Sequence, residues 1–237
     1  MSTHLIIHDR TMMQILKELS LRTYDDFVGG GAGEVVSRRE SGETRWIPIR
    51  GSDGSEALYL KVYRYEPLSW RTLFVRDKCT MESRNYAALR EFGGVAVPDV
   101  IAAGHRRKSG RLQSAFILTR GVRAARRLDE WLDDRNTNIM ARVRLLAEFA
   151  DLIARMHRAG FYHVDLQLRN VLVSLVEPDR PTLYLIDSAR GGLRYWSVRQ
   201  EYGRFRDLSS LHKGGRQVER TGAIAMVETV SGCRAAG

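Results

Sequence analysis

The sequence predicts an α+β fold with a strand-rich first half and a mainly helical second half. Short apolar strands bounded by glycine run through the first half, and the clearest of them is 57–63. The second half contains a long amphipathic stretch, 139–159, whose apolar side chains recur at helical spacing. We therefore expect two lobes, an antiparallel-sheet lobe over 1–120 and a helical lobe over 121–237.

The remaining elements are predicted from local patterns. In the first half we expect a helix over 12–19, a strand, glycine turn and returning strand over 27–36, an edge strand over 46–49, a helix over 81–92 and a strand over 115–119. In the second half we expect a helix opening at 128–132, strands near 171–173 and 183–186, and a helix over 205–212. The edge position is inferred from Pro48, which lacks a backbone N–H. The chain from about Gly214 is predicted to be poorly ordered.

The composition is that of an ordinary folded protein. Of the 237 residues, 43% are hydrophobic and 28% are charged, which suits one large domain or two small lobes. No apolar run approaches the roughly 18 residues of a membrane-spanning helix, and the apolar run at 5–7 is too short for a signal peptide. Cys79 and Cys233 have neither metal-type nor disulfide-type spacing. These features favour a cytoplasmic protein.

The formal net charge of +10 predicts a polyanionic partner or surface. An anionic membrane leaflet, a phosphorylated substrate and nucleic acid all carry the required charge. The basic residues are spread along the chain and the usual nucleic-acid-binding motifs are missing, which disfavours nucleic acid. The basic aromatic stretch 70–78 suits a membrane surface, although an ordinary connection with partly buried aromatic side chains is the simpler explanation.

A loop in the second half carries the strongest chemical signal. Residues 163–170 read HVDLQLRN and lie between the long helix and a short strand, so the loop is held at both ends. Asp165 and Asn170 are spaced so that a curled loop aims both side chains into one cleft. A carboxylate there can orient an attacking hydroxyl and accept its proton, and an asparagine oxygen is a suitable ligand for Mg²⁺.

Other features suit the handling of a phosphoryl group. Lys61 lies in the middle of an apolar strand, where its ammonium needs an anionic partner, and Glu82 in the following helix can supply one. Asp187 ends an apolar strand and is suited to bridge a metal and phosphates. The glycine cluster 29–33, which contains Gly31 and Gly33, would let backbone N–H groups approach phosphates.

Taken in order, these residues resemble the protein-kinase superfamily, and more closely the bacterial lipopolysaccharide kinases of the Kdo/WaaP family. The resemblance spans about 28–212 and rests on ESRN at 82–85, on HVDL at 163–166 followed by Asn170, and on IDSARG at 186–191. It implies a kinase-like two-lobed fold with a reduced helical lobe. It also implies ATP and Mg²⁺ as cofactors, and a hydroxyl of a lipopolysaccharide core sugar, a heptose or Kdo, as the acceptor.

The resemblance also implies a role for each residue. Asp165 would be the catalytic base, and Asn170 with Asp187 would hold the metal. Lys61 would hold the α- and β-phosphates, and Glu82 would fix Lys61. His163 would be structural, packing under the metal loop without acid–base chemistry.

The chain departs from the protein-kinase pattern at several positions. The glycine cluster does not fit G-x-G-x-x-G, which leaves the phosphate contacts of Gly31 and Gly33 open. Val164 stands where regulated kinases have arginine, and Ser188 and Ala189 stand where they have phenylalanine and glycine. No A-P-E segment follows, and only a short stretch remains for substrate-docking helices. These departures favour a small or lipid-linked sugar acceptor over a protein. The positive charge would then serve peripheral contact with the anionic cytoplasmic face of the inner membrane, or with an already phosphorylated sugar.

Simpler explanations exist for each feature alone. Lys61 and Glu82 would be solvent-facing, the glycines a flexible turn, and Asp165, Asn170 and Asp187 turn residues capped by their own side chains. Their joint occurrence in kinase order disfavours that view. Two functional alternatives stay open: a compact kinase acting on Ser, Thr or Tyr, and a nucleotide-binding pseudokinase that serves as a scaffold.

Overall fold

The chain forms two compact units. The computed structural model describes residues 1–49, 56–65, 70–73, 76–134, 137–177, 180–194 and 197–215. The first unit comprises Met1–Arg84 and Pro98–Gly121, and the second comprises Asn85–Val97 and the chain from Val122 onward. The division falls inside helix α3 (Lys78–Gly93), which the sequence predicts over 81–92. Each unit is described by itself below.

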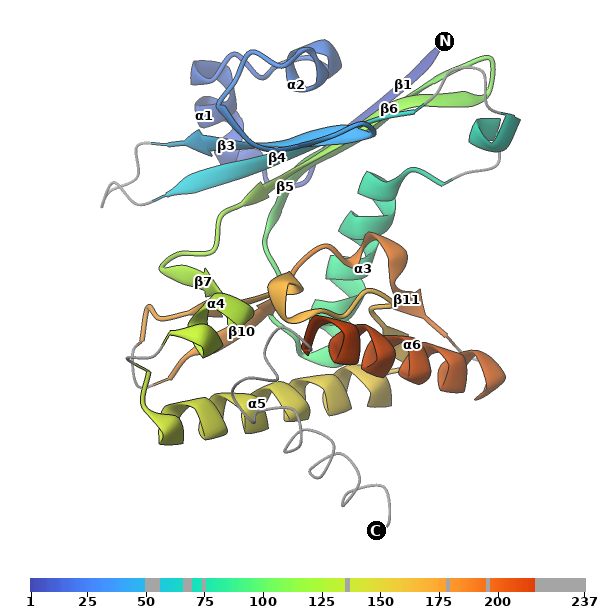
Figure 1. Ribbon diagram of the computed structural model, residues 1–237. Helices are drawn as coiled ribbons and strands as arrows, with labels where there is room; N and C mark the ends of the chain where they lie inside the picture. Colours follow the sequence, from blue (N-terminus) through green and yellow to red (C-terminus); the bar gives the residue numbers. More distant parts are fainter. Residues whose placement is uncertain are drawn as a thin grey trace. The chain divides into compact units, whose positions relative to one another are not determined.

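A six-stranded antiparallel sheet forms the first unit, with the strand order β1-β5-β6-β4-β3-β2 (Figure 1). The strands are β1 (Ser2–Ile7), β2 (Glu34–Arg39), β3 (Gly42–Pro48), β4 (Ala57–Arg64), β5 (Val100–Lys108) and β6 (Arg111–Arg120). Side chains of β4 alternate between the two faces of the sheet. Leu58, Leu60 and Val62 are buried on one face, so Lys61 lies on the other. This alternation determines where the lysine points.

Helices pack on both faces of this sheet (Figure 1). The face with Leu58 and Leu60 is covered by helices α1 (Met13–Glu18) and α2 (Tyr24–Gly29), in one apolar core. In that core Phe27 stacks on Phe116 with ring centroids 4.3 Å apart. On the opposite face the first turn of α3 buries Cys79 in a second cluster, with Ala103, Ala115 and Ile117. A short 3-10 helix, η1 (Arg10–Met12), precedes α1, and another, η2 (Trp70–Leu73), precedes α3.

Two sequence-based expectations about this unit are wrong. The expected first strand of 27–36 is the end of helix α2, because Thr23 and Asp26 form a capping box: Thr23 N–H donates to Asp26 Oδ2 at 2.6 Å, and Asp26 N–H donates to Thr23 Oγ1 at 3.4 Å. The returning strand is present as β2. Strand β3 is not at the edge, since β2 pairs along its outer side. Pro48 is tolerated because pairing with β2 stops at Trp46.

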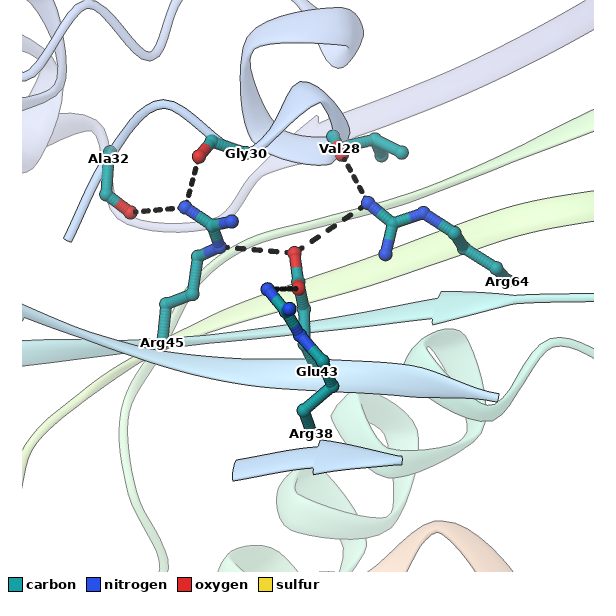
Figure 2. A network of polar contacts seen from close by, with 7 residues as sticks. All are labelled: Val28, Gly30, Ala32, Arg38, Glu43, Arg45 and Arg64. Carbon is teal, nitrogen blue, oxygen red and sulfur yellow. Dashed lines mark hydrogen bonds and ion pairs between the residues drawn. The ribbon is translucent and has the colours of Figure 1, made fainter. Parts of the chain in front are cut away.

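A polar network ties the C-terminal end of α2 to the sheet (Figure 2). Glu43 on β3 is only 8% exposed, and its carboxylate lies 3.1 Å from Arg45 Nε, 3.3 Å from Arg38 Nη2 and 3.6 Å from Arg64 Nη2. Arg45 and Arg64 also donate to carbonyls in the last turn of α2 and just after it, which lack partners within the helix. The accepting carbonyls belong to Val28, Gly30 and Ala32. Glu43 thus balances cations that fix α2 in place.

The second unit is mainly helical, as expected. Its helices are α4 (Leu128–Asp133), α5 (Ile139–Arg158) and α6 (Ser197–Gly215). Its strands are β7 (Ala125–Arg127), β9 (Val171–Ser174) and β10 (Thr182–Leu185) in one sheet, and β8 (Phe161–Tyr162) with β11 (Gly192–Leu193) in another. Helix α5 buries Leu146, Phe149, Ile153 and Met156, and ends before Gly160, which has a φ of +73°.

Helix α6 is longer than the predicted 205–212. The stretch 216–237, predicted to be poorly ordered, lies outside the described residues. Among the helices within the described ranges, none is both long and apolar enough to cross a membrane.

Gly203 allows α6 to approach β8 closely, and we expect Gly203→Ala to destabilise the protein. A Cβ at Gly203 would lie 2.4 Å from Tyr162 Cγ, so the helix or the ring must move. Overpacking of this kind costs about 1–3 kcal/mol, which outweighs the gain in helix propensity of up to about 1 kcal/mol. Gly29→Ala is the matched control, because its Cβ meets nothing within 4 Å. Urea unfolding measures both variants, and equal stabilities would contradict this packing.

Candidate active site

Lys61 and Glu82 meet in the first unit. Lys61 Nζ lies 2.8 Å from Glu82 Oε1, and the Glu82 side chain is 0% exposed while that of Lys61 is 22% exposed. The strand alternation directs Lys61 toward the face that α3 covers, and Glu82 lies one helical turn after the buried Cys79. Burial of a carboxylate is costly without a charged or hydrogen-bonded partner, which explains why the two residues pair.

Cys79, next to this pair, is not a nucleophile. Burial raises the pKa of the Cys79 thiol, and the negative charges of Glu82 and Asp77 raise it further. The side chain is 0% exposed. A protonated, inaccessible thiol acts as a small apolar side chain, so Cys79 packs beside the ion pair and takes no part in chemistry.

The predicted phosphate-binding glycines lie between α2 and β2. Gly33 has a φ of +76°, and a Cβ there would lie 2.4 Å from the carbonyl oxygen of Trp46, so close packing against β3 already explains this glycine. Gly31 is exposed, and a Cβ there would meet nothing within 4 Å. The turn that joins two strands in this region is instead the one between β2 and β3. Phosphate binding by Gly31 and Gly33 stays a prediction.

The loop 163–170 folds as a curl around Asp165 in the second unit. It leaves β8, passes through the short 3-10 helix η3 (Leu168–Asn170) and enters β9. Asn170 Nδ2 donates to the backbone oxygen of Asp165 at 2.9 Å, and Gln167 Nε2 donates to Asp165 Oδ1 at 2.7 Å. Because the amide nitrogen of Asn170 faces Asp165, its oxygen is directed away and is free to serve as a ligand.

Asp187 lies just after Ile186, which follows strand β10 and is hydrogen-bonded to this loop. Ile186 N–H donates to the Asn170 carbonyl at 3.0 Å, and the Ile186 carbonyl accepts from His163 Nε2 at 2.9 Å. Asp187 itself is in the left-handed region, with φ 59° and ψ 41°, a conformation that aspartate tolerates better than most residues. The hairpin of β9 and β10 therefore brings the predicted metal ligands Asn170 and Asp187 to one place.

The donor set of Asn170 and Asp187 fits Mg²⁺. An amide oxygen and a carboxylate are hard ligands, and Mg²⁺ commonly takes one or two protein carboxylates together with phosphate oxygens and water. No cluster of three or more His, Cys, Asp or Glu side chains occurs in the described part of the chain. The predicted pair needs no such cluster, because it contains one carboxylate and one amide.

The C-terminal part of α3 holds the segment after Asp187. Asn85 Nδ2 donates to the carbonyls of Ser188, at 2.6 Å, and of Gly191, at 3.0 Å. The Tyr86 hydroxyl accepts from Asp187 N–H at 3.2 Å. These contacts fix both ends of the 3-10 helix η4 (Ser188–Arg190), and they give Asn85 of the ESRN motif a structural task that the sequence alone did not reveal.

Asp207 on α6 anchors the loop 163–170, and no sequence pattern predicted this role. Its carboxylate is 0% exposed and accepts three hydrogen bonds: from His163 N–H at 3.1 Å, from Val164 N–H at 2.5 Å and from His157 Nε2 at 2.9 Å. Val164 has a φ of +69°, which is unfavourable for a β-branched side chain. Asp207 thus holds the residue before Asp165 in a strained conformation.

His163 is fully buried, as its proposed structural role requires. Its Nε2 faces the Ile186 carbonyl, which can only accept, so Nε2 carries the proton. The imidazole therefore joins the loop of Asp165 to the strand end of Asp187. Asp207 lies on the same face of α6 as the small residues Gly203 and Ser210, and this spacing of small residues is a weak sequence signal for its burial.

The profile of the lipopolysaccharide kinase (Kdo/WaaP) family matches residues 58–226. Among solved structures, the chain is similar to one described as WaaP in complex with acyl carrier protein, with a TM-score of 0.64 and 21% sequence identity over 95% of this chain and 96% of that chain. At that identity the likeness shows the fold alone, and it confirms the expected kinase-like fold. No curated protein matches the chain. The matched range contains Lys61 and Asp187 but excludes Gly31 and Gly33.

We expect Asp207→Asn to destabilise the second unit. An amide has one oxygen where the carboxylate has two, and its NH₂ group would face N–H donors that are buried. The expected loss is about 2–4 kcal/mol in the free energy of unfolding. Asp129→Asn is the matched control, because Asp129 pairs with Arg127 near the surface and such pairs are worth about 0–1 kcal/mol. Equal urea midpoints for the two variants would show that the loop does not depend on Asp207.

Proposed function

Because the chain belongs to the lipopolysaccharide kinase (Kdo/WaaP) family, we propose that it transfers the γ-phosphate of ATP to a hydroxyl of a lipopolysaccharide core sugar, a heptose or Kdo. Members of this family are kinases, and this chain is a kinase. The observation that carries the proposal is the hydrogen bonding of Asn170. Its side-chain amide donates to the Asp165 carbonyl, and its backbone carbonyl accepts from Ile186 N–H, next to Asp187.

In the proposed reaction Asp165 is the base. The acceptor hydroxyl oxygen forms a bond to the γ-phosphorus, the bond from that phosphorus to the bridging oxygen of ADP breaks, and the hydroxyl proton passes to the Asp165 carboxylate. Positioning and electrostatic stabilisation supply most of the catalysis in phosphoryl transfer. Lys61, held by Glu82, would bind the α- and β-phosphates.

Asn170 and Asp187 would hold Mg²⁺. When bound, the metal neutralises the charge that the β- and γ-phosphates carry. Asn170 presents its amide oxygen because its nitrogen is engaged with Asp165, and the Asp187 backbone is held by Tyr86. The proposed reaction needs no covalent enzyme intermediate, since the acceptor hydroxyl attacks the γ-phosphorus directly.

A sugar acceptor is favoured over a protein acceptor by Val164. In regulated protein kinases an arginine at this position binds the phosphate group of a phosphorylated activation loop. A valine has no group that could bind phosphate, and here the residue contributes its backbone N–H to Asp207. We infer an enzyme whose loop is permanently held in place and needs no phosphorylation.

We also propose an anionic partner for the basic surface. The similar solved protein forms a complex with acyl carrier protein, and the net charge of +10 of this chain suits an anionic protein partner or the anionic face of the inner membrane. Mixing with purified acyl carrier protein should give a complex on gel filtration that weakens as salt rises. If no complex forms at low ionic strength, the carrier protein is not a partner of this chain.

We expect Asp165→Ala to lower the rate of phosphate transfer about 100-fold to 10,000-fold, the usual contribution of a positioned base, with the fold intact. Transfer from γ-labelled ATP to lipopolysaccharide, purified from cells that lack the gene, measures this rate. Asp133→Ala changes an exposed acid on α4 and serves as the control. Mass spectrometry of lipopolysaccharide from cells with and without the gene identifies the acceptor through a missing phosphate.

Two results would oppose the proposal. Label on protein and never on lipopolysaccharide would favour a protein kinase. ATP binding without turnover on any acceptor would favour a scaffold.

A further inference from the structure

Gln167 contacts the carboxylate of the proposed base. Its Nε2 donates to Asp165 Oδ1 at 2.7 Å, and both side chains are half-buried. The backbone of Gln167 is extended, with φ −126° and ψ 151°, and immediately precedes the 3-10 helix η3. An ionised carboxylate only accepts hydrogen bonds, so the NH₂ group of the amide must face Asp165 and not its oxygen.

The backbone around Asp165 is fixed by other residues. Asp207 holds the N–H of Val164, and Asn170 donates to the Asp165 carbonyl. Neither contact sets the rotation of the carboxylate itself, which is broad for an aspartate side chain. Among the residues that the structure describes, Gln167 supplies the one hydrogen bond to the carboxylate oxygens of Asp165.

We propose that Gln167 is a positioning residue: it binds Oδ1 of Asp165 and thereby directs Oδ2 to the acceptor hydroxyl. This inference rests on the proposed function. The proton of the hydroxyl moves to Oδ2 as the oxygen–phosphorus bond forms, while Gln167 stays neutral and transfers nothing. Because proton transfer requires hydrogen-bond distance and alignment, a carboxylate that rotates freely is a poorer base even when the backbone is in place.

A positioning role for Gln167 can be distinguished from a purely structural role, in which its hydrogen bond only stabilises the loop. If Gln167 only stabilised the loop, its loss would lower the unfolding temperature, and every variant that breaks the contact would behave alike. A positioning role predicts a selective loss of kcat with unchanged KM values for both substrates. It also predicts that another hydrogen-bond donor of similar reach restores much of the rate.

The experiment compares three substitutions in the full chain. Gln167→Met keeps the shape of the side chain without a donor, Gln167→Glu places an acceptor against the Asp165 carboxylate, and Gln167→Lys keeps a donor. We expect kcat to fall about 10-fold to 100-fold in the first two variants, because small misplacements of a reacting group cause losses of this size. In Gln167→Lys most of this loss should be recovered. KM for ATP and for purified lipopolysaccharide should be unchanged, and so should the unfolding temperature.

Gln14→Glu is a matched control, because Gln14 Nε2 donates to a carboxylate, Glu18 Oε1, at 3.1 Å on the exposed face of helix α1. This variant should keep the wild-type kcat. A wild-type kcat in Gln167→Met, a rise in KM alone, or a lack of recovery in Gln167→Lys overturns the inference. An inactive wild type, or an Asp165→Ala variant as active as wild type, overturns the proposed function instead.

The contact itself has a readout that needs no activity. The side-chain amide resonances of Gln167 in a ¹⁵N–¹H spectrum should shift strongly in Asp165→Ala, because the carboxylate acceptor is gone, and those of Gln14 should not. If the Gln167 resonances stay in place, the two side chains do not interact in solution, and the positioning role is excluded whatever the activity.

Discussion

The buried carboxylate of Asp207 is the contact on which the loop around Asp165 depends. Burying a charge is costly unless hydrogen bonds replace its hydration, and here two backbone N–H groups and a histidine do so. The same bonds hold Val164 in a conformation that it would not adopt alone. Since the donors belong to residues 43 to 50 positions earlier in the chain, the loop acquires its shape only when α6 has packed, and Gly203 lets α6 come close enough.

A different constraint, the alternation of β4, governs the first unit. Helices α1 and α2 bury Leu58, Leu60 and Val62, so the intervening Lys61 must lie on the face that α3 covers. Glu82 is buried there because the ammonium compensates its charge. The arginines around Glu43 hold α2 against the sheet and thereby maintain the burial that orients β4. Packing on one face of the sheet thus determines where the Lys61–Glu82 ion pair lies on the other.

The sequence predicted the features that repeat locally and missed those that depend on distant contacts. Helix α5 and strand β4 have clear periods, and a lysine inside an apolar strand implied the contact with Glu82. Helix α2 was mistaken for a strand, because Phe27 and Val28 favour strands while the capping box at Thr23 decides the outcome. Asp207 was missed because a single acid in a polar helix looks solvated, and its partners are remote in sequence.

The geometry of the loop also explains why it identifies a reaction better than an acceptor. The side chain of His163 is hydrogen-bonded to the Ile186 carbonyl, just before Asp187. The side-chain amides of Asn170 and Gln167 are hydrogen-bonded to Asp165. These polar side chains shape the site and have little capacity left to bind a sugar or a peptide. Because such contacts would serve any hydroxyl that reaches the proposed base, discrimination between one sugar and another must come from residues beyond 163–170. In the proposed function, Val164 disfavours a phosphorylation-regulated protein kinase, whereas the choice of one sugar over another depends on the surface around the loop and not on the loop itself.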